Sequence, residues 1–490
     1  MTMDDDARSA STKASRRPRW PRTAVAVGSL VVAGAGLLAS TELHGIPSLH
    51  ATPQAQRAAV GAIIALSDDP PPPPTRSLMT WPTGAAIVPA ASGRHALPPG
   101  SPFIGAFKGS PESRLIGIYR AIGQQRTDLA LDAAASLAHD VPGFRLAQLV
   151  YADLLAARTG NTAGFGAAGA TSPSNPEVAA EIGELRDEAV QRLHALEERP
   201  PAGQVPAEFI MLPKAIHHAI AVDTTRSRLY LFENGAQGLR LVSDHYVSVG
   251  KHGVDKTVEG DQRTPLGVYF VSDRVGQGSL GEAFGAGAMQ LNYPNLLDQL
   301  HGRTGSGIYV HGVPFNTYSR PPKDSDGCVT LANDELVMLM NTVPIHDTPV
   351  IITRHVQWVS DDATRLHRAE ILDAVNQWQS VRARDDDRAL QAFYAPGAAP
   401  PTPAAPPAPP PRATVVTIRG KRHVVPPPAV PPREPISFDN LSVMTWSDAG
   451  QTMVVTFNER ATRSHRETVL RQYWQRDASR WRIVAEGPGR

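Results

Sequence analysis

The sequence contains a single cysteine, Cys328, among its 490 residues. One cysteine excludes an intramolecular disulfide and a cysteine-rich metal site, so its thiol has no internal partner. The charges are almost balanced, with 48 basic and 47 acidic residues, and this balance does not indicate a nucleic-acid-binding surface. We expect no metal cofactor, because four further histidines lack metal-ligand spacing, namely His217, His218, His252 and His301.

A chain of this length is too long for one hydrophobic core, so two or three domains with linkers are expected. Within residues 1–40, four arginines (16, 17, 19 and 22) precede an apolar run from Ala24 to Ala39. A run of about 16 residues suits either an uncleaved membrane anchor or a signal peptide. The preceding positive charges predict a cytoplasmic tail and a periplasmic location for the rest of the chain, anchored in the inner membrane.

Two segments of different character follow the apolar run. Residues 41–110 are rich in Pro, Gly and Ala and include Pro70–Pro74, a composition typical of a disordered spacer. Residues 111–200 have apolar side chains at helical spacing and predict a helical region. In it, Asn175 is expected to cap a helix that starts at Pro176 and runs through Leu196. The region is either a plain helical subdomain or a tetratricopeptide-like hairpin.

Residues 212–355 contain short β-branched and aromatic runs separated by turn residues. Asn234-Gly235 between apolar runs predicts a β-hairpin. The one helix expected here spans Asn333–Met340, with Asn333 as its N-cap. The pattern therefore predicts a mainly-β sandwich with one helix.

The last segment, residues 361–490, predicts an α+β domain. An apolar stripe of helical spacing (Leu366, Ile371, Val375 and Trp378) is followed by a short second helix at 388–394. Strand-like runs at 436–446, 453–459, 468–473 and 481–484 then alternate apolar and polar residues. A Pro-rich insertion at 396–435 interrupts the segment. Helices followed by a curved antiparallel sheet resemble the NTF2-like (SnoaL-like) fold, which suggests binding or dimerisation.

The chemistry is concentrated around Cys328. The run Ser325-Asp326-Gly327-Cys328 follows His311-Gly312, which ends a strand-like segment. A free thiol titrates near ~8.5, so a neighbouring base is needed to make it a nucleophile. A preceding glycine allows the backbone to turn its amides toward a developing oxyanion. The simpler alternative is that Cys328 is a small buried core residue.

These motifs resemble the L,D-transpeptidases of the YkuD family, whose signature is His-Gly, a variable loop and Ser/Thr-His-Gly-Cys. The upstream strand-like runs and a Thr-Pro-x-Gly turn at 264–267 occur in the family's order, and the resemblance covers about 212–355. Two positions depart from the family pattern: Asp326 replaces a histidine and Thr330 replaces a polar Arg or Asn. Asp326 is expected to point toward solvent or a loop donor; the alternative is that it supports His311.

The resemblance implies roles for the site residues. Cys328 would be the nucleophile, His311 the general base and acid, and the Gly312 carbonyl the group that orients His311. The backbone amides of Asp326, Gly327 and Cys328 would form the oxyanion hole. Three side chains are candidates for substrate binding: Ser325, Arg320 and Tyr293. A solvated loop is an equal alternative for Arg320, and structural packing is an alternative for Tyr293.

The resemblance implies acyl transfer on peptidoglycan stem peptides, with roles in cell-wall organisation and cell shape. Three functions stay open. The protein is a transpeptidase that forms 3→3 cross-links or attaches a protein to the wall, a carboxypeptidase or hydrolase in which water resolves the thioester, or an inactive wall-binding module. The partners implied are stem peptides, the cytoplasmic membrane and a wall-attached protein.

Overall fold

The computed structural model describes residues 109–160, 176–384, 386–398, 414–418, 421–425, 434–447, 451–477 and 480–489. The predictions of a tail and anchor at 1–40, and of a spacer as far as residue 108, therefore lie outside the described residues. Within the described ranges, no helix is long and apolar enough to cross a membrane.

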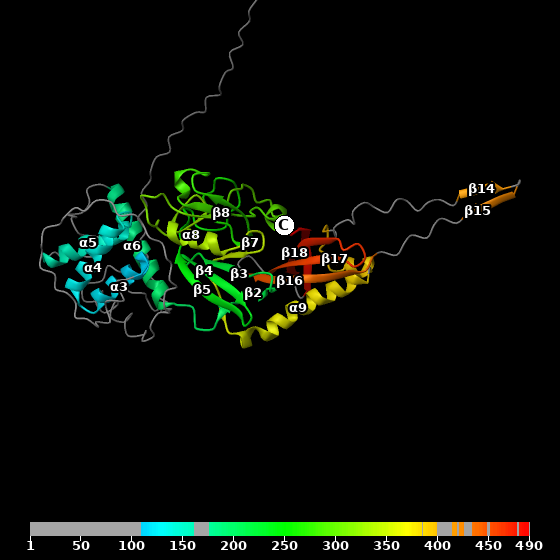
Figure 1. The fold of residues 1–490 in the computed structure, drawn as a ribbon, viewed down its shortest axis with the longest axis horizontal. Helices are drawn as coiled ribbons and strands as arrows, with labels where there is room; N and C mark the ends of the chain where they lie inside the picture. The colour runs from blue at the N-terminus through cyan, green and yellow to red at the C-terminus, as the bar shows by residue number, and fades with distance from the viewer. Residues whose placement is uncertain are drawn as a thin grey trace, which may run out of the picture. The chain divides into compact units, whose positions relative to one another are not determined.

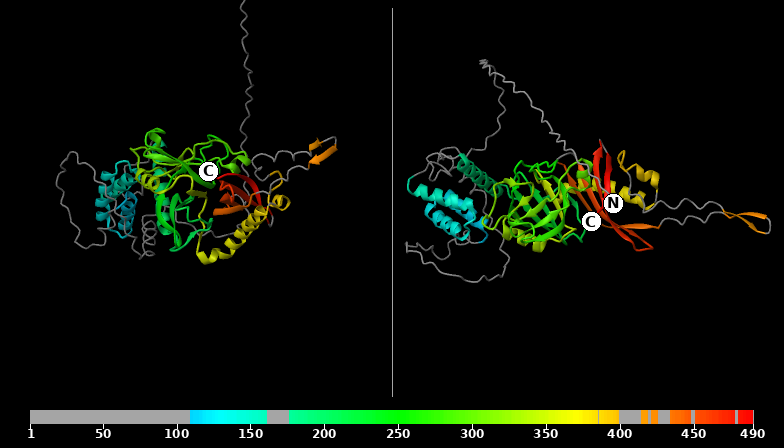
Figure 2. Two further views of the ribbon diagram at one scale, coloured as in Figure 1. Left: turned by 45° about the vertical axis from the view of Figure 1, so that its right-hand side comes forward. Right: turned by 90° about the horizontal axis from the view of Figure 1, so that it is seen from above.

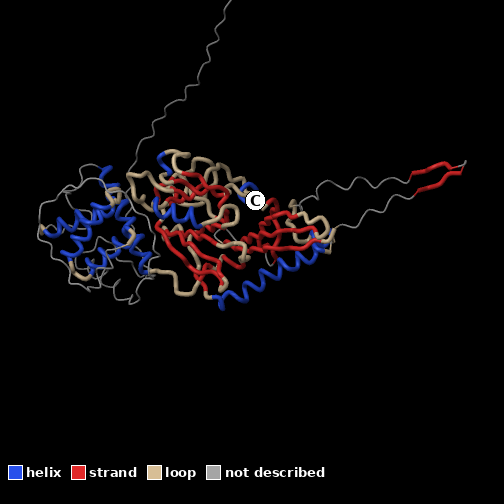
Figure 3. The backbone as a smooth tube through the Cα atoms, in the orientation of Figure 1, coloured by secondary structure: helices blue, strands red, loops and turns tan. Residues whose placement is uncertain are grey.

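The region predicted to be helical does consist of helices. They are α3 (Pro111–Gly123), α4 (Thr127–Asp140), α5 (Arg145–Arg158) and α6 (Pro176–Glu197), shown in blue in Figure 3. Helix α3 begins at Pro111 because the Ser110 side chain accepts a hydrogen bond from the Ser113 N–H. The four helices share an apolar core that includes Leu115, Ile118 and Leu137. The predicted cap Asn175 lies outside the described residues.

A curled eight-stranded sheet forms most of the segment predicted to be catalytic (Figure 1). Its strands, in spatial order, are β11 (Val329–Thr330), β9 (Tyr309–His311), β8 (Gly287–Leu291), β7 (Gly267–Gly276), β12 (Pro349–Thr353), β3 (His218–Asp223), β4 (Arg228–Gly235) and β5 (Gly238–Tyr246). Two of the pairs, β11–β9 and β12–β3, are parallel. A two-stranded sheet joins β6 (Val249–Gly250) to β10 (Lys323–Ser325). The mainly-β prediction is confirmed, with one large curled sheet providing most of the strands.

The predicted hairpin between β4 and β5 exists, but its turn lies two residues later than expected. Gly235 pairs with Gly238, so Ala236 and Gln237 make the turn. The Asn234 side chain instead donates hydrogen bonds to the carbonyls of Pro213 and Ile216. The amide of Asn234 therefore anchors the chain that enters the domain.

The predicted helix α8 (Asn333–Thr342) is present, but Asn333 is not its N-cap. Ala332 occupies the cap position and makes no side-chain hydrogen bond there. Two further helical turns were not predicted: η1 (Glu282–Phe284) and α7 (Leu296–Leu300). Both are too short to give a periodic apolar pattern.

The C-terminal segment combines helix α9 (Asp361–Ala383) and helix α10 (Asp387–Gln391) with a sheet. The sheet contains β16 (Ile436–Trp446), β17 (Thr452–Ala461), β18 (Glu467–Asp477) and β19 (Arg480–Pro488), close to the four predicted runs. Ile371, Val375 and Trp378 of α9 are fully buried against it, and Figures 1 and 2 show α9 lying along the sheet.

Part of the predicted Pro-rich insertion forms a hairpin. Strand β14 (Thr414–Ile418) pairs antiparallel with β15 (Lys421–Val425). Residues 399–413 and 426–433 of the insertion lie outside the described residues. The NTF2-like assignment of the C-terminal segment stays a prediction.

The C-terminal sheet has a fifth strand that comes from far upstream. Strand β2 (Phe209–Met211) pairs antiparallel with β16, and β1 (Val205–Pro206) pairs with β13 (Trp358–Val359). The sheet face opposite α9 packs against the catalytic sheet through Met444, Val454 and Tyr473, which belong to the same apolar cluster as the catalytic strands. Residues 209–211, which lie just before the segment 212–355, therefore belong to the same sheet as the strands of the C-terminal segment.

Candidate functional site

Two neighbouring strands bring His311 and Cys328 together. His311 is the last residue of β9, and Cys328 immediately precedes β11. The two strands pair in parallel, with Val329 opposite Val310 and Thr330 opposite His311. Cys328 thus lies at the start of the strand next to that of His311. It precedes by two residues Thr330, which is paired with His311. Since side chains two residues apart share a face of a sheet, this register favours a thiol and an imidazole on the same side.

The turn before Cys328 requires a glycine. Gly327 has a φ of +123°, and a Cβ there would lie 2.7 Å from the carbonyl oxygen of Arg263. This approach of the Arg263 backbone excludes any side chain at position 327 without movement of the chain.

Ser325, predicted to contact substrate, stabilises the same turn through its side chain. The residue is 2 % exposed. Its hydroxyl donates to the Cys328 carbonyl at 2.6 Å and accepts from the Gly327 N–H at 3.2 Å. Because the hydroxyl is committed on both sides, Ser325 supports the nucleophile from within the protein.

The hydrogen bond from Gly327 to Ser325 involves one of the three amides predicted to form the oxyanion hole. The Gly327 N–H already has an acceptor, so it is not available to an oxyanion in this state. The backbone N–H groups of Asp326 and Cys328 make no hydrogen bond with other described residues. Two of the three predicted donors are therefore left for substrate.

His311 is buried and held by its own neighbour. Its Nδ1 atom lies 2.7 Å from the Gly312 carbonyl oxygen, and the Phe284 ring packs on the imidazole with centroids 4.4 Å apart. A carbonyl only accepts, so Nδ1 carries the proton and Nε2 keeps its lone pair. Burial lowers the pKa of His311 to about 4, and the positive charge of Arg320 acts in the same direction. The imidazole is therefore a neutral base at ordinary pH.

The Cys328 thiol is protonated in the resting state. It donates to the Gly307 carbonyl, with 3.6 Å between Sγ and oxygen. Burial raises its pKa to about 11, and the Asp326 charge adds to that effect. The Tyr309 backbone N–H and the charges of Arg320 and Lys256 oppose it. The resting pair is thus a neutral thiol beside a neutral imidazole.

Asn333 holds the backbone next to His311, and sequence reasoning missed this role. Its Oδ1 accepts from the Ala286 and Val313 N–H groups at 2.9 and 3.3 Å, and its Nδ2 donates to the Val313 carbonyl at 2.8 Å. A Cβ at Gly312 would lie 2.1 Å from Asn333 Oδ1. The close fit explains why glycine follows the histidine and makes Asn333 a positioning residue.

Asp326 is exposed and accepts a hydrogen bond from the side chain of a loop residue. The Gln262 Nε2 atom donates to Asp326 Oδ1 at 2.8 Å. No contact between the Asp326 carboxylate and His311 occurs within the described part of the chain. The carboxylate is therefore turned away from the base, with a loop donor as its partner.

Asp326→Asn is expected to change the rate of Cys328 acylation less than about tenfold. The substitution removes a nearby negative charge that raises the pKa of the thiol, so the direction is toward faster acylation. A pH–rate profile of acylation for both proteins measures the effect. A loss above about a hundredfold would mean that Asp326 supports the base instead.

The positive charge of Arg320 lowers the pKa of both Cys328 and His311. Its Nη1 donates to the Asp324 carbonyl at 3.0 Å, and its own carbonyl accepts from the Tyr246 hydroxyl at 3.0 Å. A positive charge held in this position suits a carboxylate of a substrate.

Tyr293, predicted either to bind substrate or to serve structural packing, makes packing contacts in this structure. The side chain is 5 % exposed and packs edge-on against Tyr269 in the apolar core. Its hydroxyl donates to the Thr304 carbonyl at 3.1 Å. The alternative of structural packing holds for this residue.

The helical region contacts the loop that carries Arg320. The ring of Phe144 packs on Tyr318 with centroids 4.4 Å apart, and the Tyr318 N–H donates to the Gly143 carbonyl at 3.0 Å. The Ser319 hydroxyl donates to Glu188 Oε1 of α6 at 2.7 Å. Residues 143–144 and Glu188 therefore hold the loop 318–320 in place. We call these three residues the clamp.

A buried cluster of charges lies behind this clamp. Arg192 of α6 pairs with Glu188 and Glu112, and Glu112 also pairs with Arg228 of the catalytic strand β4. Burial alone would raise the pKa of Glu112, but Arg228 and Arg192 lower it to about 2. Removing one partner would leave a buried charge uncompensated, which typically costs about 3–5 kcal/mol. The helices are therefore tied to the catalytic sheet.

Gly143→Ala tests the clamp. A Cβ at Gly143 would lie 2.7 Å from the Asn316 carbonyl oxygen, and backbone atoms cannot yield as a flexible side chain can. The free energy of unfolding should fall by about 1–3 kcal/mol, and acylation of Cys328 should slow. Urea unfolding and adduct formation measure the two effects.

Gly183→Ala is the matched control for that substitution. Gly183 lies within helix α6, and a Cβ there would meet nothing within 4 Å. Alanine should stabilise the helix by about 0.5–1 kcal/mol and leave acylation unchanged. Equal behaviour of the two variants would contradict the clamp.

Metal ligands are not gathered at this site. Among the residues that the structure describes, no group of three or more His, Cys, Asp or Glu side chains is arranged to hold a metal ion.

Comparison with known proteins identifies the catalytic segment. Residues 217–352 match the family model of YkuD, the L,D-transpeptidase catalytic domain. A search of the curated proteins finds no match.

Solved structures similar to this chain include three bacterial proteins. Bd1075 of Bdellovibrio bacteriovorus has a TM-score of 0.45 at 22 % identity, over 58 % of this chain and 98 % of that one. The helical cell shape determining protein Pgp2 of Campylobacter jejuni has a TM-score of 0.42 at 19 % identity, over 55 % and 91 %. An L,D-transpeptidase from Mycobacterium smegmatis has a TM-score of 0.20 at 16 % identity, over 28 % and 59 %. At these scores the likeness carries no argument about function.

Proposed function

We propose that this protein is a peptidoglycan L,D-transpeptidase that uses Cys328 as its nucleophile. The family match of residues 217–352 supports peptidoglycan stem peptides as the substrate class. The observation that carries the proposal is the state of His311. Its Nδ1 is committed to the Gly312 carbonyl, which leaves Nε2 as a buried neutral base one strand from the only thiol of the chain.

The first step forms a thioester. The thiol leaves its contact with Gly307, His311 Nε2 takes the proton, and the sulfur attacks the carbonyl carbon of the diamino acid at stem position three. The C–N bond to the terminal D-alanine then breaks. His311 returns the proton to the departing amine, so the free amino acid leaves and His311 is neutral again.

The second step transfers the acyl group. An amine from a neighbouring stem attacks the thioester carbon, gives its proton to His311, and the sulfur leaves to regenerate the thiol. The product is a 3→3 cross-link, or a protein attached to the wall where the amine belongs to a protein. The thioester conserves the energy of the cleaved amide, so no nucleotide is consumed.

The oxyanion of each tetrahedral intermediate needs donors, and the N–H groups of Cys328 and Asp326 are the candidates. Neither has an acceptor among the other described residues. One donor of this kind is worth about 3 kcal/mol of transition-state stabilisation. Arg320, which lies close enough to influence both reacting groups, is the candidate to hold a stem carboxylate.

We further propose that the reaction takes place on the periplasmic side of the cytoplasmic membrane. The support is in the sequence, where the arginines at 16, 17, 19 and 22 precede the apolar run from Ala24 to Ala39. Fractionation of cells that express the full chain tests this. Recovery of the full-length protein in the cytoplasmic fraction would contradict it.

The proposal is tested by incubating the full-length protein with purified tetrapeptide muropeptides and measuring the products by mass spectrometry. Dimers joined 3→3, with release of D-alanine, are the expected result. Tripeptides without dimers would assign a carboxypeptidase, in which water resolves the thioester. Unchanged muropeptides that bind the protein would assign a wall-binding module and overturn the proposal.

A further inference from the structure

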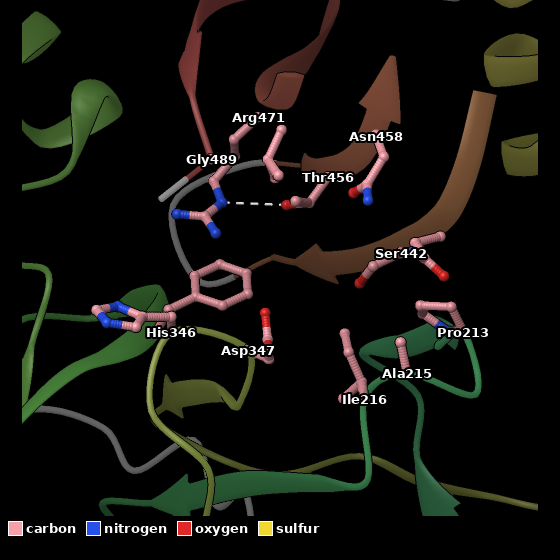
Figure 4. Close-up of a pocket in the computed structure, with 13 residues that line it drawn as sticks. Pro213, Ala215, Ile216, His346, Asp347, Ser442, Thr456, Asn458, Arg471 and Gly489 are labelled. Carbon is pink, nitrogen blue, oxygen red and sulfur yellow. Dashed lines mark hydrogen bonds between the residues drawn. The ribbon is translucent and has the colours of Figure 1, made fainter. Parts of the chain in front are cut away.

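A small cavity lies between the catalytic segment and the C-terminal sheet, away from Cys328. Its volume is about 50 Å³, enough for a few water molecules or one compact ion. Figure 4 shows Arg471, Thr456, Asn458 and Ser442 on the strand side of this cavity. His346, Asp347 and Ile216 of the catalytic segment line the other side.

Arg471 lines this cavity and is almost completely buried, which is rare for an arginine. The residue is 5 % exposed, and its guanidinium lies flat on the Phe270 ring, with 3.5 Å from Cζ to the centroid. Its Nε donates to the Thr456 hydroxyl at 3.1 Å, and its guanidinium also has a side-chain hydrogen bond with Tyr473. No carboxylate of the described residues forms an ion pair with Arg471. The guanidinium has five N–H donors, so most of them have no partner among the described residues beyond these two side chains.

Ser442 supplies a second unsatisfied group in the same cavity. The residue is 1 % exposed, and its hydroxyl has no hydrogen-bond partner. A buried polar group without a partner typically costs about 1–3 kcal/mol, so such groups are rare in native proteins. This hydroxyl and the Arg471 guanidinium, which has no ion-pair partner among the described residues, line the same cavity and indicate that something polar fills it.

We infer that this cavity is a binding site for a compact oxyanion, a carboxylate or a phosphate, which Arg471 and Ser442 hold. An arginine presents two parallel N–H groups that match the two oxygens of a carboxylate or phosphate. The Ser442 hydroxyl donates a further hydrogen bond to such an anion. Burial lowers the pKa of Arg471, because a buried positive charge is unfavourable, while Tyr473 and Asp347 raise it. A bound anion would stabilise the charged guanidinium further.

The charge of Asp347 limits what the site accepts. Its carboxylate lines the cavity opposite the sheet and repels an anion, so the ligand must be small enough to sit against Arg471. The 50 Å³ volume sets the same limit. Extended ligands such as a whole stem peptide do not fit, although one carboxylate of such a ligand does.

The experiment measures thermal unfolding of the full-length protein in sodium phosphate, sodium acetate and sodium chloride at equal ionic strength. Phosphate or acetate at about ten times its dissociation constant should raise the melting temperature by about 1–3 °C above the chloride control. A larger shift with phosphate would indicate free phosphate as the ligand, and a larger shift with acetate would indicate a carboxylate. Equal melting temperatures in all three salts would overturn the inference.

Three variants separate this site from a general salt effect. Arg471→Met, which keeps the contact with Phe270 but removes the donors, should abolish the anion shift. Ser442→Ala, which removes a hydroxyl with no partner, should fold normally and weaken anion binding by about threefold to tenfold. Arg476→Met is the control, because Arg476 already pairs with Glu370 on the surface, and it should leave the shift unchanged.

The Ser442→Ala protein decides the question where Arg471→Met does not fold. An anion shift of full size in Ser442→Ala, or one that persists in a folded Arg471→Met protein, would assign the effect elsewhere and overturn the inference. Binding is read without any enzymatic assay, so the result is independent of the proposed transpeptidase activity.

Discussion

Replacement of Cys328 by alanine should abolish acyl transfer, with a loss of at least about 10⁴-fold in rate. Cys328 is the only thiol in the sequence, so no other side chain can form the thioester. The fold should be retained, because the residue is only partly buried and the turn around it depends on Ser325 and Gly327. Intact-mass spectrometry after incubation with a carbapenem-type acylating agent measures the adduct directly.

The wild-type protein should gain the mass of one acylating molecule, and the Cys328→Ala protein should gain none. The Gly183→Ala protein provides the matched control, since that helix position contacts nothing near the site. An adduct of equal size on the Cys328→Ala protein would place the nucleophile on another side chain and end the proposed mechanism.

Replacement of His311 by glutamine should slow acylation by about 10²–10⁴-fold. Glutamine can still donate to the Gly312 carbonyl, but it cannot accept the thiol proton. The thiol has a pKa of about 11, so very little thiolate exists near neutral pH and a base is required. Stopped-flow acylation measures both proteins.

The pH dependence distinguishes a base from a merely structural histidine. The pKa of His311 is about 4, so the imidazole stays neutral as pH rises and the wild-type rate should be flat from about pH 6 to 9. Without the base, the rate should follow the thiolate fraction and rise about tenfold per pH unit over that range. A wild-type rate that rises through an inflection between about pH 6 and 8 would mean that His311 titrates there and would contradict the neutral pair.

The proposed nucleophile, Cys328, and the proposed base, His311, could be selected from the sequence because each lies in a short motif with a definite chemical requirement. Gly327 was recognisable as a glycine that the backbone requires, and a Cβ there would clash; the similar clash at Gly312 was not predicted. The four strand runs of the C-terminal segment were also recognisable, because alternation of apolar and polar residues is a local signal.

Three of the predicted site residues make internal contacts that the sequence does not show. Ser325, Tyr293 and the Gly327 amide were placed from their position in a motif or loop, yet each is committed to a hydrogen bond inside the protein. Sequence patterns report which groups can bond and leave open which partner is nearest. The same limit hid Asn333, whose three hydrogen bonds join segments far apart in the chain.

Strand β2 has a consequence for how the polypeptide assembles during synthesis. Its only partner in the five-stranded sheet is β16, which the ribosome makes after the whole catalytic segment. The catalytic segment is therefore an insertion between the first strand of that sheet and the other four. Domains often fold in order from the N-terminus, but here the edge strand β2 cannot pair until residues 436–446 have been synthesised. A nascent chain released before residue 436 would keep an unpaired edge.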